Sequence, residues 1–82
     1  MYLSVIGVKP LKNYKLLLKF ENNEERIFDV NSLFNFGRFN ELKAKDIFNS
    51  VRISFDTIQW SNNLDLDPEF LYKESKKKGV KL

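Results

Sequence analysis

The run Tyr14–Phe20 limits the fold of this chain more than any other stretch of its sequence. Two lysines, Lys15 and Lys19, lie within the run. Large apolar side chains stand at every second position: Tyr14, Leu16, Leu18 and Phe20. Because the side chains of a strand alternate between two faces, this period of two predicts a β-strand with one apolar and one largely basic face. Such a strand needs partner strands and a layer that covers its apolar face.

Partner strands are predicted on both sides of this run. Upstream, β-branched and aromatic residues in the segment 2–8 favour a strand that ends near Pro10. Downstream, Asn22 and Asn23 stand at the centre of a polar break. Since asparagine tolerates positive φ, we expect a tight hairpin turn there, after which the segment 26–30 pairs back. Three consecutive antiparallel strands form a meander.

The spacing of apolar residues then changes. The segment 30–37 begins with the i, i+3, i+4 spacing of a short helical turn, with Asp29 or Asn31 as its cap. We expect Asn40 to cap a second short helix. The stretches VRISF and TIQW alternate again around Asp56, and form either a hairpin or one kinked strand.

These elements predict a single α+β domain over residues 1–82. It is an antiparallel β-meander of three N-terminal strands plus one or two later strands, covered by short helices and a C-terminal helix. The length of 82 residues suits one domain, and a 43% hydrophobic, 30% charged composition is typical of a globular protein. We expect the last helix to begin at Pro68 and to end at Gly79, so that residues 73–82 form its lysine-rich end and tail.

The absence of cysteine and histidine excludes several classes of site. Disulfides, thiolate nucleophiles, zinc or iron sites built on Cys or His, and Ser-His-Asp triads all need one of these residues. Three isolated glycines cannot form a phosphate-binding loop. No apolar run approaches the ~20 residues that cross a bilayer, and the N-terminus lacks the features of a signal peptide. We therefore expect a cytoplasmic protein that does not enter the membrane.

The stretch WSNNLDLDPEFLY, residues 60–72, concentrates carboxylates and invites a metal interpretation. Asn63, Asp65 and Asp67 occupy alternate positions, and a glutamate lies twelfth, as in a calcium-binding EF-hand loop. That loop needs glycine at its sixth position, where this chain has Pro68. A strand-like run, rather than a helix, also precedes it. We therefore predict no metal site.

A helix start explains the same residues better. Asp67 is a good N-cap, Pro68 suits the first helical position, and Glu69 complements the positive end of the helix dipole. Leu66 and Leu71 have the spacing of a hydrophobic staple. Catalysis by paired acids would need a cleft between the carboxyl groups, which nothing in the sequence predicts. We predict no catalytic residues and no cofactor, and expect that the protein is not an enzyme.

Positive charge is concentrated near the C-terminus. Residues 73–82 hold five lysines against one glutamate, whereas the remaining 72 residues hold nine basic and ten acidic groups. This end could bind nucleic acid phosphates or an acidic partner, although a solvated helix end is the simpler interpretation. Four lysines of the first hairpin could form a second basic patch, or could serve only to discourage aggregation at a sheet edge: Lys9, Lys12, Lys15 and Lys19.

Three stretches resemble the DUF2442 family of small, uncharacterised bacterial proteins over nearly the whole chain. They are VKPLKNYKLLLKFENNEERIFDV, LFNFGRFNELK together with IFNSVRI, and IQWSNNLDLDPEFLY. The last is the most specific, because Trp, a turn, Asp-x-x-Pro-Glu and Leu-Tyr recur in the family. Glycines that the family often has in the two turns are replaced here by Asn23 and Asn63, which also tolerate positive φ.

The resemblance implies an α+β fold and no established activity. Some relatives carry a helix-turn-helix domain after this module, and others sit beside a second small protein, as toxin–antitoxin pairs do. This chain stops just after the module, so we expect no DNA-binding domain of that kind.

We expect a small protein-interaction module, such as the antitoxin-like or regulatory partner in a two-gene pair, that binds another small protein. The alternative is a nucleic-acid-binding regulator that acts through the basic C-terminal tail. Arg38, on a turn between two phenylalanines, and Asp65, which has no assigned structural role, are candidate contacts. The full predicted partner surface is Arg38, Trp60, Asp65, Lys76, Lys77 and Lys78.

Overall fold

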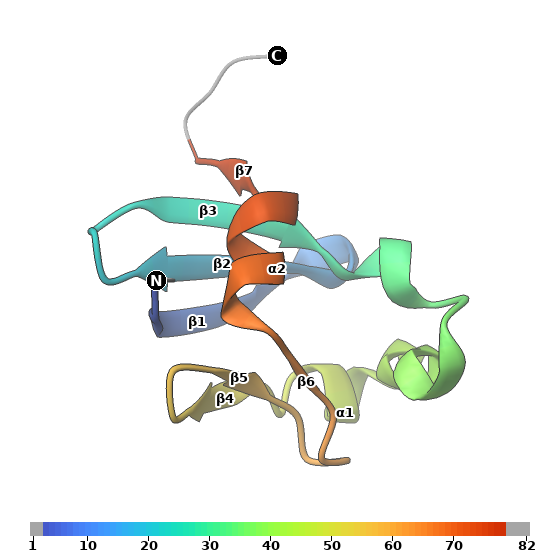
Figure 1. Cartoon of the computed structure of the whole chain (residues 1–82). Helices are drawn as coiled ribbons and strands as arrows, with labels where there is room; N and C mark the ends of the chain where they lie inside the picture. Colours follow the sequence, from blue (N-terminus) through green and yellow to red (C-terminus); the bar gives the residue numbers. More distant parts are fainter. Residues whose placement is uncertain (1–2, 79–82) are drawn as a thin grey trace.

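The computed structural model describes residues 3–78, which form an α+β fold of two antiparallel sheets and short helices (Figure 1), as the sequence predicts. The strands are β1 Val5–Leu11, β2 Lys15–Phe20, β3 Glu25–Asp29, β4 Arg52–Ser54, β5 Thr57–Gln59, β6 Asp65–Leu66 and β7 Lys76–Lys77. The helices are the 3-10 segments η1 Lys12–Tyr14, η2 Val30–Leu33 and η3 Gly37–Lys43, and the α-helices α1 Lys45–Phe48 and α2 Pro68–Glu74.

The first sheet has the strand order β1-β2-β3-β7, so the predicted three-strand meander is confirmed. Its first strand continues through Pro10 to Leu11. Proline is tolerated because β1 is the outermost strand, where a missing N–H costs no ladder hydrogen bond. The second strand begins one residue later than predicted, since Asn13 (φ 62°) and Tyr14 (φ 60°) both adopt left-handed conformations in the turn between β1 and β2.

Two turns of the same construction follow the aromatic residues Phe20 and Trp60. In each, the second asparagine has a φ of 69° and donates its N–H to the carbonyl of the aromatic residue, at 2.8 Å for Asn23 and 2.9 Å for Asn63. The asparagine before it accepts from a backbone N–H two residues on. Positive φ at this position is why asparagine serves here. Both predicted Asn-Asn turns are therefore confirmed.

The second sheet has the order β4-β5-β6, and its first two strands form a hairpin, one of the two predicted alternatives. The turn consists of Phe55 and Asp56, and Phe55 has a φ of 57°. The Asp56 carbonyl accepts the N–H of Val5 at 2.9 Å. This bond fastens the tip of the hairpin to the start of β1.

Between the strands, Asp29 caps η2, since its carboxylate accepts the N–H of Asn31. Asn40 lies inside η3 rather than at its start, so it is not a cap. Gly37, which also has a left-handed backbone conformation, begins this segment at φ 53°.

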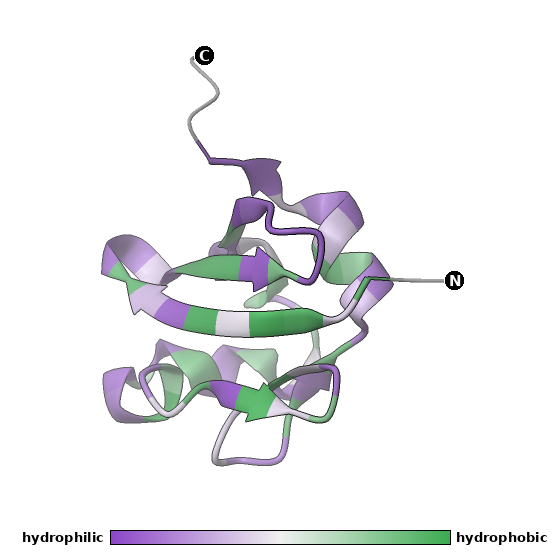
Figure 2. Ribbon diagram, turned by 90° about the vertical axis from the view of Figure 1, so that its left-hand side faces the viewer, coloured by the Kyte–Doolittle hydropathy of each residue, from purple (hydrophilic) through white to green (hydrophobic). Residues whose placement is uncertain are grey.

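The core lies between the first sheet and a second layer that contains the helices and the second sheet. The alternation in β2 places Leu16, Leu18 and Phe20 in this core, where they are fully buried. The second layer contributes the fully buried Leu42, Ile58, Trp60 and Leu71. In Figure 1, α2 crosses in front of β2 and β3. Figure 2 shows hydrophobic and hydrophilic residues mixed along the strands, as a sheet with one covered face requires.

The C-terminal segment differs from the prediction. Helix α2 ends at Glu74, and Lys76 and Lys77 pair with β3 as strand β7. Ser75 ends the helix because its extended backbone leaves the helical path, and its buried side chain is bound by Arg26. The prediction of a lysine-rich helix end is therefore wrong for residues 75–78. The predicted helix end at Gly79 lies outside the described residues.

Candidate interaction surfaces

Within residues 3–78, no helix or strand covers the face of the first sheet that points away from the core. We call it the outer face, and strand register assigns its residues: Gly7, Lys9, Leu11, Lys15, Leu17, Lys19, Glu25, Ile27, Asp29 and Lys76. All of its charged residues are exposed. Leu16 and Phe28, which alternate with them along β2 and β3 and point to the opposite face, are buried. Four of the six charges on this face are lysines.

The centre of the outer face is a row that crosses all four strands. Lys9 pairs with Leu17, Leu17 with Ile27, and Ile27 with Lys76. Since neighbouring strands lie about 4.8 Å apart, the backbones of the two lysines stand about 14 Å from each other. Leu17 and Ile27 are partly exposed between them. The row is therefore a short apolar strip with a cation at each end.

The other lysines of the outer face have acidic neighbours. Lys15 stands opposite Asp29 and Lys19 opposite Glu25, and the Nζ of Lys78 lies 3.4 Å from Glu25 Oε1. Neither Lys9 nor Lys76 stands directly opposite a carboxylate in the register. The two ends of the apolar row are therefore cationic positions that face no carboxylate across the sheet.

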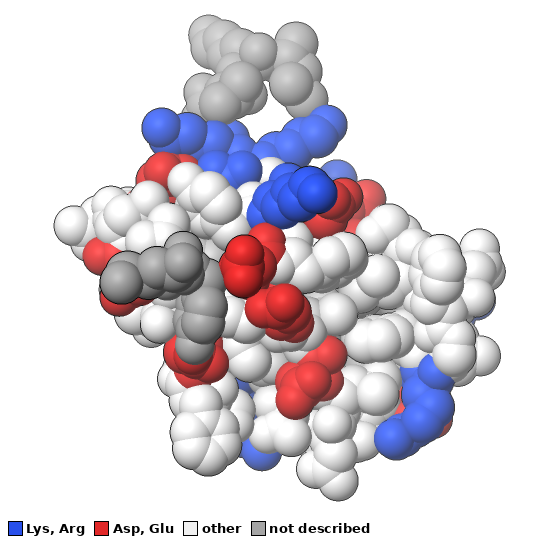
Figure 3. Space-filling model, in the orientation of Figure 1, with Lys and Arg blue, Asp and Glu red and all other residues white. Residues whose placement is uncertain are grey.

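The predicted lysine cluster is divided between two faces of the sheet. Lys76 lies on the outer face opposite Ile27, whereas Lys77 lies opposite Arg26 on the covered side. Lys78 donates its N–H to the carbonyl of Glu25 at 2.8 Å and so extends the pairing. Figure 3 shows basic side chains gathered beside β7, while acidic side chains run down the face that carries α2.

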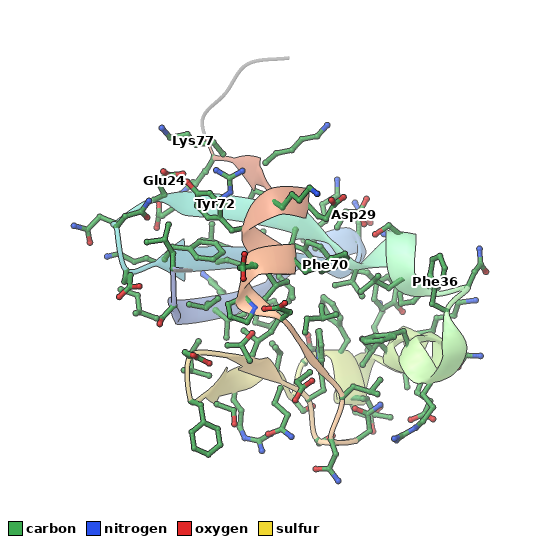
Figure 4. All side chains as sticks on the ribbon, in the orientation of Figure 1. Glu24, Asp29, Phe36, Phe70, Tyr72 and Lys77 are labelled. Carbon is green, nitrogen blue, oxygen red and sulfur yellow. The ribbon has the colours of Figure 1, made fainter. Side chains whose placement is uncertain are left out.

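Arg26 holds the C-terminal segment to the sheet through a set of contacts that we call the Arg26 clamp. Its Nε donates to Ser75 Oγ and its Nη2 to the Ser75 carbonyl, both at 2.8 Å. Its Nη1 donates to Glu24 Oε1 at 2.9 Å, and its guanidinium lies 4.3 Å from the ring centroid of Tyr72. The Tyr72 hydroxyl also donates to Glu24, at 2.8 Å. Figure 4 shows Tyr72 and Glu24 together beside β3, with Lys77 above them.

These contacts perturb one carboxylate. The hydrogen bond from Tyr72, followed by that from Arg26, lowers the pKa of Glu24 below its ordinary value of 4.5. Each nitrogen of the Arg26 guanidinium donates one hydrogen bond within the chain, and the cation lies against an aromatic ring. The arrangement fits a structural role, because its hydrogen bonds and ring contact join β3, α2 and the segment that leads into β7.

Arg38 is bound within its own chain. Its guanidinium donates to both carboxylate oxygens of Glu41, at 3.1 and 3.3 Å, and to the carbonyl of Asn62 at 2.9 Å. The Asn62 amide donates to Glu41 at 2.9 Å. The bonds from Arg38 and then Asn62 lower the pKa of Glu41, and the bond to Glu41 raises the pKa of Arg38. The Arg38 side chain is still 59% exposed, so it joins η3 to the Trp60 turn while keeping one open side.

Trp60 is not a surface residue. It is fully buried, so it cannot touch a partner, and this part of the predicted partner surface is wrong. The indole Nε1 has no hydrogen-bond partner within residues 3–78. The sequence could not exclude an exposed position, because tryptophan is common both in cores and at interfaces.

The N-terminus of α2 has the predicted cap. Asp67 Oδ1 accepts the N–H of Glu69 at 3.1 Å, and Pro68 occupies the first turn. Asp65 lies in β6 opposite Gln59 and is exposed. In the described part of the chain, no three acidic residues come together as a metal site would require.

Two open cavities occur near these elements. One, of about 520 Å³, lies at the β1–β2 turn, and its lining includes Pro10, Leu11, Tyr14 and Phe48. The other, of about 650 Å³, lies by the Asn23 turn and is lined only by polar and charged residues. Neither Asp65 nor Asp67 lines either cavity.

Sequence reasoning missed several exposed hydrophobic residues. Phe55 is 100% exposed and Phe36 63%, and Ile6 and Ile53 are also exposed. Figure 4 shows Phe36 on the loop to one side of the sheet, apart from Phe70 on α2. One signal in the sequence could have indicated an exposed phenylalanine: Phe55 stands beside Asp56, where the chain was expected to turn. The alternating pattern within each strand also indicated which residues lie on the outer face. Which of them stand opposite one another on neighbouring strands could be seen only from the strand register of the structure.

The comparisons with known proteins identify the family but no function. The family model described as a protein of unknown function, DUF2442, matches residues 5–77. Because the match covers nearly the whole chain, the chain belongs to this family. No curated protein and no solved structure matches it significantly. None of the helices in residues 3–78 has the length and hydrophobicity that crossing a bilayer requires.

Proposed function

We propose that this DUF2442 protein is a non-enzymatic interaction module that binds an acidic protein partner through the outer face of its first sheet. The observation that carries the proposal is the central row, in which two apolar side chains lie between Lys9 and Lys76. A partner segment with an apolar centre and a carboxylate toward each end would match it. Charge complementarity of this kind favours association and selects the partner.

The roles of the acidic and hydrogen-bonded groups within residues 3–78 support a non-enzymatic function. Asp65 and Asp67 are exposed, and Asp67 is occupied in capping α2. The most heavily hydrogen-bonded polar groups, in the Arg26 clamp, bind one another. A general acid or base instead needs a position within reach of a bound substrate.

Nucleic acid is the second candidate, and one observation favours it. Lys76 of the C-terminal segment shares the outer face with Lys9, Lys15 and Lys19, so the tail and the hairpin contribute to one basic face. However, sheets that read single-stranded RNA stack its bases on aromatic side chains. The middle of this face holds Leu17 and Ile27 instead. We therefore prefer a protein partner in a cytoplasmic setting, such as the other product of a two-gene, toxin–antitoxin-like pair.

The test uses two double variants with the same change in charge. Lys9→Glu/Lys76→Glu alters the ends of the central row, whereas Lys73→Glu/Lys77→Glu alters exposed lysines on the side that carries α2. Deleting the tail would be a poor test, because β7 and Ser75 are part of the fold. Each tagged protein is recovered at native expression level from its host, and the stoichiometric partner is quantified by mass spectrometry.

We expect the outer-face variant to lose the partner and the control variant to retain it. Recovery of the unmodified protein alone, or equal retention by both variants, would refute the proposal. Binding of single-stranded nucleic acid that falls steeply with salt, and is lost only in the outer-face variant, would favour the second candidate. Co-expression with the neighbouring gene product, followed by gel filtration, tests the two-gene pair directly.

A further inference from the structure

Three exposed hydrophobic residues lie on two chain segments that meet at one corner of the molecule, which we call the hairpin corner: Ile6, Ile53 and Phe55. The bond from the Val5 N–H to the Asp56 carbonyl, 2.9 Å long, brings their chain segments together. Ile6 follows Val5 at a bulge in β1, and Phe55 precedes Asp56 at the hairpin tip. The corner is thus an apolar projection on a fastened hairpin, at the edge of the sheet rather than on its outer face.

Phe55 breaks two local rules at once. A φ of 57° is unusual for any residue other than glycine, asparagine or aspartate, and two-residue hairpin turns favour those residues. An aromatic ring that is 100% exposed also gains no stability from burial in the single chain. Strained backbone conformations of this kind are concentrated at functional sites, where the residue serves binding or catalysis rather than stability.

The other end of β1 carries a cavity that suits an aromatic side chain. Its volume is about 520 Å³, and its lining combines apolar or aromatic residues with polar and charged ones: Pro10, Leu11, Tyr14 and Phe48, and Lys12, Asn13, Lys45 and Asn49. Its walls are fixed, since the Tyr14 hydroxyl donates to the Lys43 carbonyl at 2.5 Å and the Tyr14 ring packs edge-on against Phe48 at 5.1 Å. Pre-formed cavities of this size that combine apolar walls with polar groups are typical binding sites.

We propose that two copies of the chain associate reciprocally, with Phe55 of each copy inserted in the cavity beside Tyr14 of the other. The hairpin corner and the cavity lie at opposite ends of β1, whose seven residues span about 20 Å. In a dimer whose two-fold axis crosses β1 near its middle, the same contact would be made twice. A contact repeated in this way closes under two-fold symmetry, so assembly stops at a dimer.

The test is sedimentation equilibrium of the full chain over a wide concentration range, since a small interface of this kind gives weak association. Phe55→Asp removes the aromatic ring and still allows the turn, because aspartate tolerates this conformation. Asn49→Trp fills the cavity, and Phe36→Asp is the control at an exposed phenylalanine elsewhere. Thermal unfolding of each variant verifies that it folds.

We expect a dimer for the unmodified chain and for the control, and at least about a tenfold rise in dissociation constant for each of the other variants. An equimolar mixture of Phe55→Asp with Asn49→Trp should regain a heterodimer, because one intact contact is restored. The proposal is overturned by a monomeric unmodified chain, by dimers of either test variant at unchanged affinity, by a mixture that stays monomeric, or by growth beyond two copies.

Discussion

The Arg26 clamp is expected to control how firmly α2 and β7 are held to the sheet. Replacing Arg26 with methionine keeps an unbranched side chain but removes three hydrogen bonds and the contact with Tyr72. Each hydrogen bond contributes about 0.5–1.5 kcal/mol net, and a cation–π contact about 0.5–1 kcal/mol. Because Ser75 is only 5% exposed, water cannot readily replace its lost partner. We expect a loss of about 2–4 kcal/mol in the free energy of unfolding.

Urea unfolding of Arg26→Met measures this loss, and Ser75→Ala is the matched control. The alanine variant removes only the two hydrogen bonds of Ser75 Oγ, which accepts from Arg26 Nε and donates to the Tyr72 carbonyl, so it should cost about 1–2 kcal/mol. Hydrogen exchange then locates the effect. The N–H of Lys78, which donates to Glu25, should exchange much faster in Arg26→Met, whereas amides of the β1–β2 ladder should change only with global stability.

Two results would contradict this reasoning. A change below about 0.5 kcal/mol, the range of ordinary surface substitutions, would mean that water replaces the guanidinium without cost. A large loss with equal acceleration of exchange at Lys78 and along β2 would mean that the C-terminal segment does not open separately. In that case the clamp would stabilise the whole fold rather than fasten one part of it.

Three further predictions follow from local geometry. Asp67→Ala should cost about 1 kcal/mol in urea unfolding through loss of the cap, while Asp65→Ala, at an exposed carboxylate, should stay within about 0.5 kcal/mol; equal effects would refute the capping role. Since folding lowers the pKa of Glu24 below 4.5, its stabilising effect is complete above that pH and is lost as the pH falls through the folded-state value. The Glu24→Gln variant should therefore lose less stability on acidification than the unmodified chain, and parallel acid titrations of stability would refute this. Phe55→Asn should raise stability by about 1 kcal/mol by relieving a left-handed phenylalanine, and an unchanged melting temperature would show that this backbone is not strained.

Much of the fold could be predicted from local patterns. The alternation in β2 gave its buried face, and Asn22-Asn23 and Asn62-Asn63 both marked turns that need positive φ. These signals are local because a strand's faces and a turn's dihedral angles depend on adjacent residues. The start of α2 was predictable for the same reason, since a cap and a proline act within one helical turn.

The candidate surfaces depended on contacts between distant residues. Lys76 and Lys77 have the composition of a solvated helix end, yet they form a strand, because Arg26 binds Ser75 from 49 residues away and places the following chain against β3. The division of the lysines between two faces follows from that pairing. Trp60 was misplaced for a related reason, since its burial depends on the core cluster, whose members come from distant parts of the chain.

The late position of β7 in the chain has a kinetic consequence. Strands β1, β2 and β3 are consecutive hairpin neighbours and can pair as soon as they exist, whereas β7 must close a loop of about fifty residues. Until it does so, β3 presents an unpaired edge next to uncovered apolar side chains. Such an intermediate is prone to pair with other chains. Once β7 has paired with β3, the two lysines of β7 discourage pairing of the finished sheet edge with another chain.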